Sequence, residues 1–441
     1  MDPITLSIII MLALFALLAI GLPIGFSMAV TGFVGSTILL GELGPSLSLL
    51  GQTAYETTIT YNLSVVPLFI LMGYFASNSG LSESLFKACN TWLGHRRGGL
   101  GLATIGGCGA FAAVCGSSLA TAATMTQVAL PEMKRFNYAD SLATGTIAAG
   151  GTIGILIPPS VILVLYGILT ETNIGDLFLA GFIPGILTVI FFMATISIIT
   201  RIYPDMGPRG DKSTGREKLA AFKGVWGTIV LFLVVIGGIY LGVFSPEEAA
   251  GIGASGALAL ALIARTMTWA VFMNCLMETV RTSAMIFTIL IGAILFNNFL
   301  VLSAVPDAIG EWIGGLPFSN TVIMLIILLI YLIMGCALDS LAMILLTIPI
   351  FFPVVAGLGF DPIWFGIIVV MVVELGLITP PIGMNVFIIK GMATEVPLGS
   401  IYKGVLPFVI AQILLISLIV IFPDIATWLP STAQDIQAFF K

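Results

Sequence analysis

The chain has 441 residues, of which 59% are hydrophobic and only 9% are charged, and its mean hydropathy is +1.15. Soluble domains carry about 25% charged residues, so this composition excludes a soluble globular protein and predicts a multi-pass membrane protein. The net charge is −6, and the sequence has no basic patch with interleaved aromatic residues, which argues against nucleic-acid binding. The five cysteines and the single histidine form no spaced ligand motif, so they predict neither a metal site nor a disulfide framework.

Runs of about 20 apolar residues predict membrane-spanning helices along the chain. The first run lacks the basic start and the cleavage site of a signal peptide, so we expect it to be retained as a helix. The predicted spans are 4–21, 24–41, 58–77, 177–200, 222–244, 247–265, 283–302 and 400–422.

Two longer regions, about 99–170 and 321–394, are apolar but interrupted by Gly and Pro. In each region an apolar run reaches a tip of small residues and returns, at Cys115–Ser118 and at Gly335–Ser340. This pattern predicts a re-entrant hairpin. A Gly-x-x-x-Pro-Pro sequence follows each hairpin and predicts a helix broken into two halves, because proline removes backbone donors and restricts the residue before it.

The two regions are copies of one unit. Ser118-Leu119-Ala120 recurs as Ser340-Leu341-Ala342, and Pro158-Pro159 recurs as Pro380-Pro381, in both cases 222 residues later. In a bilayer, broken helices are tolerated only where the freed backbone groups face protein or a water-filled cavity. Paired interruptions in the two halves of a membrane protein therefore predict a transport site between the repeats.

Basic residues gather in the segment 201–223, which we expect to lie on the cytoplasmic side. We favour inverted repeats, since hairpins that enter from opposite faces would form a site near the middle of the membrane. The predicted organisation has five segments: scaffold helices in 1–98, a first hairpin and broken helix in 99–170, scaffold and connecting helices in 171–302, a second hairpin and broken helix in 303–394, and a C-terminal helix in 395–441.

The tips and breaks are rich in hydroxyls and free carbonyls, which are the ligands that hard cations prefer. Small polar residues also permit close helix packing, and this alternative stays open for each single residue. Candidate ligands and contacts in the first copy are Gly116, Ser117, Ser118, Thr121, Thr152 and Gly154; those in the second are Asp339, Ser340, Gly376, Thr379 and Asn385.

Asp339 and Glu374 are acidic residues within apolar runs, and intramembrane carboxylates are functional candidates by default. The other copy has Ser117 and Thr152 at these positions. Three roles are open: a cation ligand, a proton-titrating group, and a cap for the amides of a broken helix. We favour a structural or cation-supporting role. Arg281 could bind a substrate carboxylate, but an interfacial anchor is the preferred interpretation.

At these motifs the sequence resembles the large membrane subunit of tripartite ATP-independent periplasmic (TRAP) transporters. The stretches that carry the resemblance are 115–124 (CGSSLATAAT), 150–160 (GGTIGILIPPS), 374–385 (ELGLITPPIGMN) and the opening 21–25 (GLPIG). The resemblance covers essentially the whole chain. It implies a sodium-driven elevator transporter of the bacterial inner membrane, and it implies two partners: a separate small four-helix membrane subunit and a periplasmic substrate-binding protein.

The resemblance also implies site residues. One sodium site would use Cys115, Ser118, Gly335, Gly376, Thr379 and Ile382, partly through backbone carbonyls. The repeat offset gives a second sodium site near Gly154, Ile157, Ser160, Ala337 and Ser340. The substrate would lie between the tips, with Ser117, Thr121 and Asn385 as candidate contacts and with Asp339 and Glu374 in supporting roles.

The favoured function is therefore sodium-coupled import of an organic acid, such as a C4-dicarboxylate or a sialic acid, delivered by a binding protein. The alternative is a stand-alone sodium-coupled dicarboxylate transporter that needs no binding protein. An intramembrane enzyme is disfavoured, because the chain has no intramembrane histidine and no HExxH motif. A channel is also disfavoured, because two broken repeats suit alternating access better.

Overall fold

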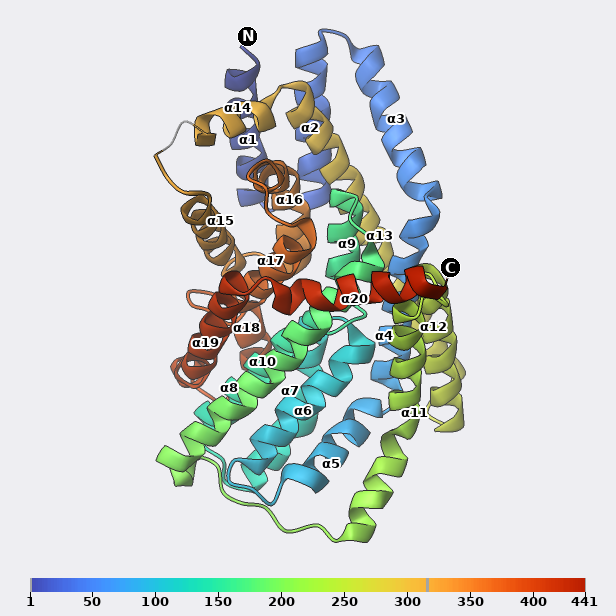
Figure 1. Cartoon of the computed structure of the whole chain (residues 1–441), viewed down its shortest axis with the longest axis vertical. Helices are drawn as coiled ribbons and strands as arrows, with labels where there is room; N and C mark the ends of the chain where they lie inside the picture. Colours follow the sequence, from blue (N-terminus) through green and yellow to red (C-terminus); the bar gives the residue numbers. More distant parts are fainter. Residues whose placement is uncertain (1, 315–316, 441) are drawn as a thin grey trace.

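The computed structural model describes residues 2–314 and 317–440, and these residues form twenty α-helices, two short 3₁₀ helices and no strand (Figure 1). The predicted all-α class is thus confirmed. Residues 1, 315–316 and 441 belong to the predicted segments 1–98, 303–394 and 395–441 but lie outside the described residues.

The first part of the chain has more helices than the apolar runs predict. Its helices are α1 (Pro3–Ala19), α2 (Ile24–Leu40), α3 (Leu43–Ile59), α4 (Val65–Asn78) and α5 (Leu81–Leu93). The expected span 58–77 was wrong at its start, because a 3₁₀ turn at Tyr61–Ser64 separates α3 from α4 and the chain bends there by 60°. The helices α3 and α5 contain too many polar residues to form long apolar runs, so the apolar runs did not predict them.

The first repeat begins with a hairpin of α6 (Gly99–Cys115) and α7 (Ser118–Arg135). The broken helix follows as α8 (Asp140–Leu156) and α9 (Val161–Thr170), whose axes differ by 43°. The long helix α10 (Ile174–Ile202) comes next and packs against α6, α8, α17 and α19.

A basic connection leads from α10 to α11 (Gly215–Tyr240). The expected loop 201–223 is therefore shorter, and three of its basic residues lie in α11. The reason is a capping box: the Thr214 hydroxyl accepts from the Glu217 N–H at 3.3 Å, and the Glu217 carboxylate accepts from the Thr214 N–H at 2.7 Å. The helices α12 (Pro246–Ile263) and α13 (Trp269–Leu302) complete the connection.

The second repeat follows the same element order. After α14 (Val305–Gly314) come the hairpin helices α15 (Asn320–Gly335) and α16 (Ser340–Gly357), the broken pair α17 (Pro362–Gly376) and α18 (Met384–Met392), and the long helix α19 (Leu398–Ile421). Each helix from α15 to α19 begins 221 to 224 residues after its counterpart among α6 to α10. The expected C-terminal helix in 395–441 is two helices, since α20 (Asp424–Phe440) follows α19.

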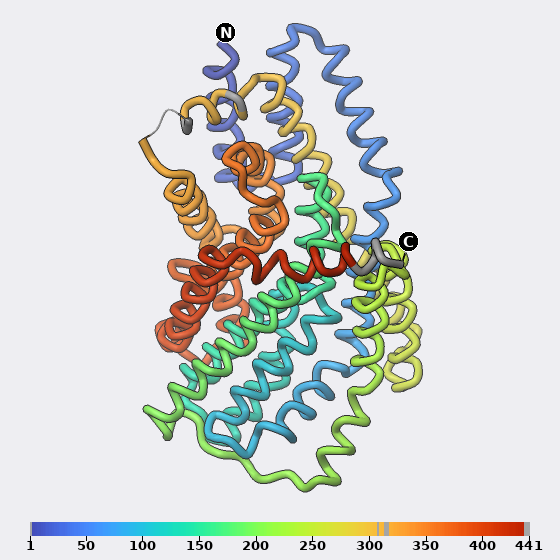
Figure 2. Tube along the Cα trace, viewed as in Figure 1, coloured from blue at the N-terminus to red at the C-terminus, as the bar shows by residue number. Residues whose placement is uncertain are grey.

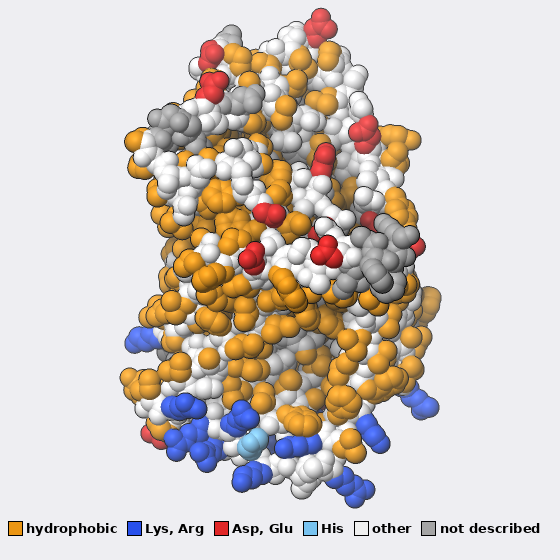
Figure 3. Space-filling model, viewed as in Figure 1, with side chains coloured by type: hydrophobic (Ala, Val, Ile, Leu, Met, Phe, Trp, Pro, Cys, Tyr) orange, Lys and Arg blue, Asp and Glu red, His pale blue; other side chains and the backbone are white. Residues whose placement is uncertain are grey.

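The two hairpins enter the molecule from opposite ends and meet near its middle. In Figures 1 and 2, α6 and α7 rise from the lower end, whereas α15 and α16 descend from the upper end. Lys and Arg side chains gather at the lower end (Figure 3), where α10 ends and α11 begins. By the positive-inside rule this end is cytoplasmic.

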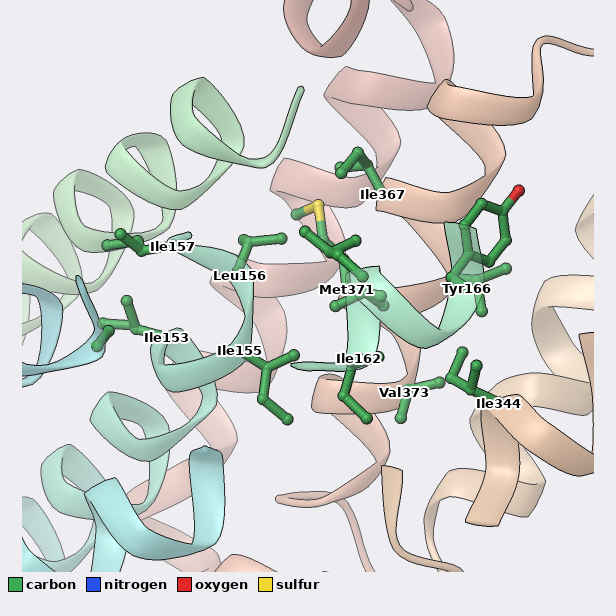
Figure 4. Packing of buried hydrophobic residues seen from close by; sticks show 14 of the residues in the cluster. Ile153, Ile155, Leu156, Ile157, Ile162, Tyr166, Ile344, Ile367, Met371 and Val373 are labelled. Carbon is green, nitrogen blue, oxygen red and sulfur yellow. The ribbon is translucent and has the colours of Figure 1, made fainter. Parts of the chain in front are cut away.

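Small residues allow the helices to pack backbone against backbone. A Cβ on Gly292 of α13 would lie 2.2 Å from the carbonyl oxygen of Gly25 on α2, and a Cβ on Gly145 of α8 would lie 2.3 Å from the backbone of Gly404 on α19. Only glycine fits such contacts. Around the first break, apolar side chains of α8 and α9 pack against α16 and α17, for example Ile155, Ile162 and Val373 (Figure 4).

Five of the described helices are long and apolar enough to cross a membrane, or up to seven spans if each of two bent pairs is counted as one. These five are α10, α11, α13, α16 and α19. Eight full spans were expected from the sequence. The difference arises mainly because several apolar helices, including α1 and α2, have only 17 residues.

Candidate functional site

A buried carboxylate joins the two hairpin tips. Glu374 lies two residues before the end of α17 and is only 1% exposed. The Ser118 hydroxyl donates to Glu374 Oε2 at 2.5 Å, and the Ser340 hydroxyl donates to Oε1 at 3.2 Å. Ser118 and Ser340 are the first residues of α7 and α16 and occupy equivalent positions in the two repeats. Glu374 therefore binds equivalent atoms of both hairpins at once.

No basic side chain compensates this carboxylate. The ion pairs found within 2–314 and 317–440 involve only Lys134, Arg135 and Arg281, none of them with Glu374. A buried carboxylate is costly unless its oxygens are hydrogen-bonded. The two serine hydroxyls supply these bonds, so the stability of the core depends on both tips being closed over Glu374.

A cavity of about 160 Å³ opens beside the tips. Both tips line it, with Ser117 and Ser118 on one side and Asp339 and Ser340 on the other. The remaining walls come from the break between α8 and α9 and from the helices α4 and α13. The cavity therefore lies where the predicted transport site was expected, between the two repeats.

Three helices begin at this cavity: α7, α9 and α16. The Asp339 carboxylate accepts from the Ala342 N–H at 3.0 Å and caps α16. The Ser117 hydroxyl caps α7 in the same way, at 3.4 Å from the Ala120 nitrogen. Of the three roles open for Asp339, the geometry supports capping. Helix N-termini carry partial positive charge and favour anions.

The residues expected for the first sodium site divide into two groups. Gly335 and Gly376 touch, since a Cβ on Gly376 would lie 2.5 Å from the carbonyl carbon of Gly335. Ser118 is hydrogen-bonded to Glu374, which lies two residues before Gly376 in α17. Cys115 lies in the first tip and lines the cavity.

The break after α17 holds the other two residues of that set. The Thr379 hydroxyl donates to the Leu375 carbonyl at 2.6 Å, and the Ile382 carbonyl accepts from the Tyr402 hydroxyl of α19 at 2.5 Å. The structure thus places the Ile382 oxygen against α19.

The residues expected for the second sodium site also lie in two places. Gly154 and Ser160 flank the first break, and a Cβ on Gly154 would lie 2.7 Å from the Ser117 carbonyl oxygen. The Ile157 side chain packs on α10, while Ala337 and Ser340 belong to the second tip. Each break therefore contacts the tip of its own repeat, and the Ser118–Glu374 bond crosses between repeats.

The three expected substrate contacts differ in exposure to the cavity. Ser117 lines it, whereas Thr121 is fully buried and donates to the Ser117 carbonyl at 2.8 Å. Asn385 is also fully buried, and its Nδ2 donates to the Ala148 carbonyl at 3.3 Å. Its Oδ1 has no hydrogen-bond partner among the described residues.

Sequence reasoning missed the part of the cavity that α4 and α13 form. The Tyr74 hydroxyl lies 3.0 Å from the Thr282 hydroxyl, and both side chains line the cavity together with Ser77. The sequence holds a weak indication that α4 and α13 belong together, because Phe69–Gly73 resembles Thr288–Gly292 and extends the repeats upstream. Arg281 lies one residue before Thr282, is exposed and binds Glu278 at 2.8 Å, in keeping with an anchoring role.

The fold and this site define a class of protein: a multi-pass membrane transporter with two hairpins and two broken helices around a central cavity. The family model of the tripartite ATP-independent periplasmic transporter, DctM component, matches residues 11–425. The chain belongs to this family and is a transporter permease component of the bacterial inner membrane, not an enzyme.

Two curated relatives illustrate a similarity over nearly the whole length of both chains. The C4-dicarboxylate TRAP transporter large permease protein DctM of Pseudomonas aeruginosa is 36% identical over 91% of this chain and 93% of its own. The sialic acid TRAP transporter large permease protein SiaM of Vibrio cholerae is 32% identical, over 94% and 96% respectively. Among solved structures, the YdaH transporter of Alcanivorax borkumensis matches with a TM-score of 0.63 at 16% identity, covering 86% of this chain and 88% of that one, which shows likeness of fold.

Proposed function

We propose that this chain is the large permease subunit of a sodium-coupled importer of an organic acid. The observation that carries the proposal is the cavity between the two hairpin tips, which three helix N-termini face. This environment favours a carboxylate, and the relatives named above are transporters of C4-dicarboxylates and sialic acid. The chain supplies no P-loop motif, so an ion gradient is the proposed energy source.

Sodium would enter as a co-transported ion at the two tips. Hydroxyls and unwound carbonyls of both tips and both breaks offer oxygen ligands, which suit a hard cation of low charge. Among the described residues, no group of three or more His, Cys, Asp or Glu side chains is placed to hold a metal ion. The proposed ligands are therefore mainly neutral oxygens.

The transport step is proposed to be an elevator movement of the two hairpins against α2, α4 and α13. Entry of the hairpins from opposite ends supports inverted repeats, in which either tip can open toward one side of the membrane. The close glycine packing of α2 on α13 supports a stiff static scaffold.

Two partners complete the proposed system: a small four-helix membrane subunit and a periplasmic binding protein that delivers the substrate. The name of the family, which describes a tripartite periplasmic transporter, supports both. A stand-alone dicarboxylate transporter remains the second candidate. The likeness of fold to YdaH, which is named simply as a transporter, is the observation that keeps it open.

One reconstitution experiment tests the proposal. Proteoliposomes that hold this chain with its small subunit would be given a labelled C4-dicarboxylate or sialic acid, with the matching binding protein present or absent. Saturable uptake that requires both an inward sodium gradient and the binding protein is expected. Undiminished uptake without sodium on either side would overturn the ion coupling, and saturable uptake by this chain alone would favour the stand-alone transporter.

A further inference from the structure

Another cavity, of about 530 Å³, lies at the end of the molecule where Lys and Arg side chains gather (Figure 3). It is lined by basic side chains from three separate segments: the turn between α5 and α6, the end of α10, and the loop that follows α10. These residues are His95, Arg96, Arg97, Arg201, Arg209 and Lys212. Figure 3 shows the histidine among Lys and Arg side chains at this end.

The cations of this cavity have no acidic partner. Within 2–314 and 317–440, no ion pair reaches any of them, although Asp205 and Asp211 lie in the same loop. Like charges held together without a counterion raise the free energy of the empty site. An anion that entered would remove this repulsion and would meet several guanidinium groups, which match phosphate oxygens in geometry.

The backbone fixes the loop that carries two of these cations. The Gly98 N–H donates to the Gly207 carbonyl at 2.9 Å, and the Gly210 N–H donates to the Gly94 carbonyl at 3.0 Å. The Tyr138 hydroxyl donates to the Pro208 carbonyl at 3.1 Å. These bonds join the loop to the turns before α6 and after α7, so the backbone that carries Arg209 and Lys212 is held in place while their exposed side chains reach into the cavity.

Neighbouring side chains place the cavity at the level of lipid headgroups. Trp92 and Tyr203 are 53% and 61% exposed, and aromatic residues of this kind gather at membrane interfaces. The Ile198 and Ile202 side chains, one turn apart on α10, are also exposed and offer an apolar surface beside the cavity. A ligand with a charged head and an apolar tail fits this combination better than a free anion does.

We propose that this cavity binds the phosphate headgroup of an anionic phospholipid of the cytoplasmic leaflet, whose acyl chains lie along α10. Basic pockets between membrane helices on the cytoplasmic side are suited to such headgroups. The proposal depends on the membrane orientation and not on the transported substrate.

The test compares two variants of the full chain that lose the same number of charges. Arg96→Gln/Arg97→Gln/Arg209→Gln removes three cations of the cavity. Lys87→Gln/Arg216→Gln/Lys223→Gln removes three cations from α5 and α11 at the same end. Each protein would be titrated in neutral detergent with phosphatidylglycerol, with phosphatidylcholine and with inorganic phosphate, and bound lipid would be counted by native mass spectrometry.

The expected result is selective binding of phosphatidylglycerol by the parent chain, weakened about tenfold or more by the first triple variant and less than threefold by the second, since each cation near an anionic lipid contributes roughly a fivefold factor. Equal losses in both variants would overturn the proposal in favour of a general charge effect. Displacement of the lipid by millimolar phosphate would overturn it in favour of a free-anion site.

A charge-preserving variant keeps the test decisive if the first triple variant fails to fold. Arg96→Lys/Arg97→Lys retains the net charge but loses the paired guanidinium donors, so it is expected to keep only part of the lipid selectivity, and the single variant Arg97→Gln should also lose part of it. Unchanged selectivity in Arg97→Gln and in Arg209→Gln, both correctly folded, would contradict the proposal.

Discussion

The two hairpins share a backbone design but lie in different surroundings. In the first, α6 is rich in Gly and Ala, and none of its large apolar side chains is exposed. In the second, α15 is built of Ile and Leu, and its side chains Leu325, Leu329 and Ile333 are 52%, 55% and 63% exposed. The two repeats therefore share the positions of their turns and breaks but differ in side chains. The first hairpin is enclosed by the rest of the chain, whereas the second has an exposed apolar face.

The largest effect is expected where the two hairpins meet. Glu374→Ala should reduce uptake at least tenfold, because it leaves the Ser118 and Ser340 hydroxyls buried without their acceptor, at a cost of about 1–3 kcal/mol for each group. Initial uptake rates in proteoliposomes, corrected for the amount of inserted protein, measure the effect.

The two serine variants supply the control for this prediction. Ser118→Ala should cost more than Ser340→Ala, since its bond is shorter, and neither should add a full further loss in the Glu374→Ala background. Losses that simply add would show that the three residues act independently.

A second prediction compares glycines at the two breaks. Gly376→Ala would force a Cβ to 2.5 Å from Gly335, and Gly154→Ala would force one to 2.7 Å from the Ser117 carbonyl oxygen. Overpacking of this kind costs about 1–3 kcal/mol, so both variants should lower the Tm in detergent and impair uptake.

Gly391→Ala, in α18, serves as the matched control for these glycine variants. Nothing lies within 4 Å of a Cβ at this position, so alanine should be neutral or slightly stabilising there. If all three alanine variants melt and transport alike, the close contacts at the breaks do not limit stability.

A third prediction tests the difference in surroundings directly. Ala112→Leu in α6 inserts a bulky side chain where the parent side chain is fully buried, and it should destabilise the protein by about 1–3 kcal/mol. Leu329→Ala in α15 removes a side chain that is 55% exposed and should change the Tm in detergent far less. A larger effect for Leu329→Ala would indicate that a partner or the rest of the chain covers α15.

The smallest effect concerns an exposed ion pair between the two repeats, Lys134 of α7 with Glu395 in the loop before α19. The hydrogen bond from Lys134 lowers the pKa of the Glu395 carboxyl below its usual value. A lowered pKa adds stability above the ordinary carboxyl pKa, and this stability is lost as the pH falls through the lowered value.

Glu395→Gln should therefore lower the Tm slightly at neutral pH. The difference from the parent should shrink in high salt and as the pH falls below the ordinary carboxyl pKa of about 4, and it should disappear once the pH is below the lowered pKa. A Tm difference that persists under acid conditions would assign the effect to packing instead of charge.

Much of the architecture could be predicted from the sequence, because Gly and Pro recur at the tips and breaks of both copies with the same spacing. The 222-residue offset and the hairpins are direct consequences of this recurrence. The helices α3, α5, α14 and α20 could not be predicted in the same way, since they lack long uninterrupted apolar runs. In α5, α14 and α20 the apolar residues recur at helical spacing on one face, which is a different signal from a long apolar run.

The candidate site was only partly predictable for a different reason. Ser118, Ser340 and Glu374 were each singled out, but 256 residues separate Ser118 from Glu374, and no local pattern reveals which hydroxyl a buried carboxylate binds. The cavity wall from Tyr74 and Thr282 was missed because a tyrosine and a threonine in apolar helices resemble ordinary packing residues.

Glu374 and its counterpart Thr152 show how the two repeats differ at one pair of equivalent positions. A group that touches equivalent atoms of both copies lies near the pseudo-symmetry axis, so one carboxylate serves two hairpins. At the corresponding position of the first copy, Thr152 binds its own helix through the Ala149 carbonyl at 2.7 Å. A second carboxyl group there would be one more buried polar group that needs hydrogen-bond partners of its own, which is energetically unfavourable. The side chains of the two repeats therefore depart from symmetry at the very point where the two halves meet.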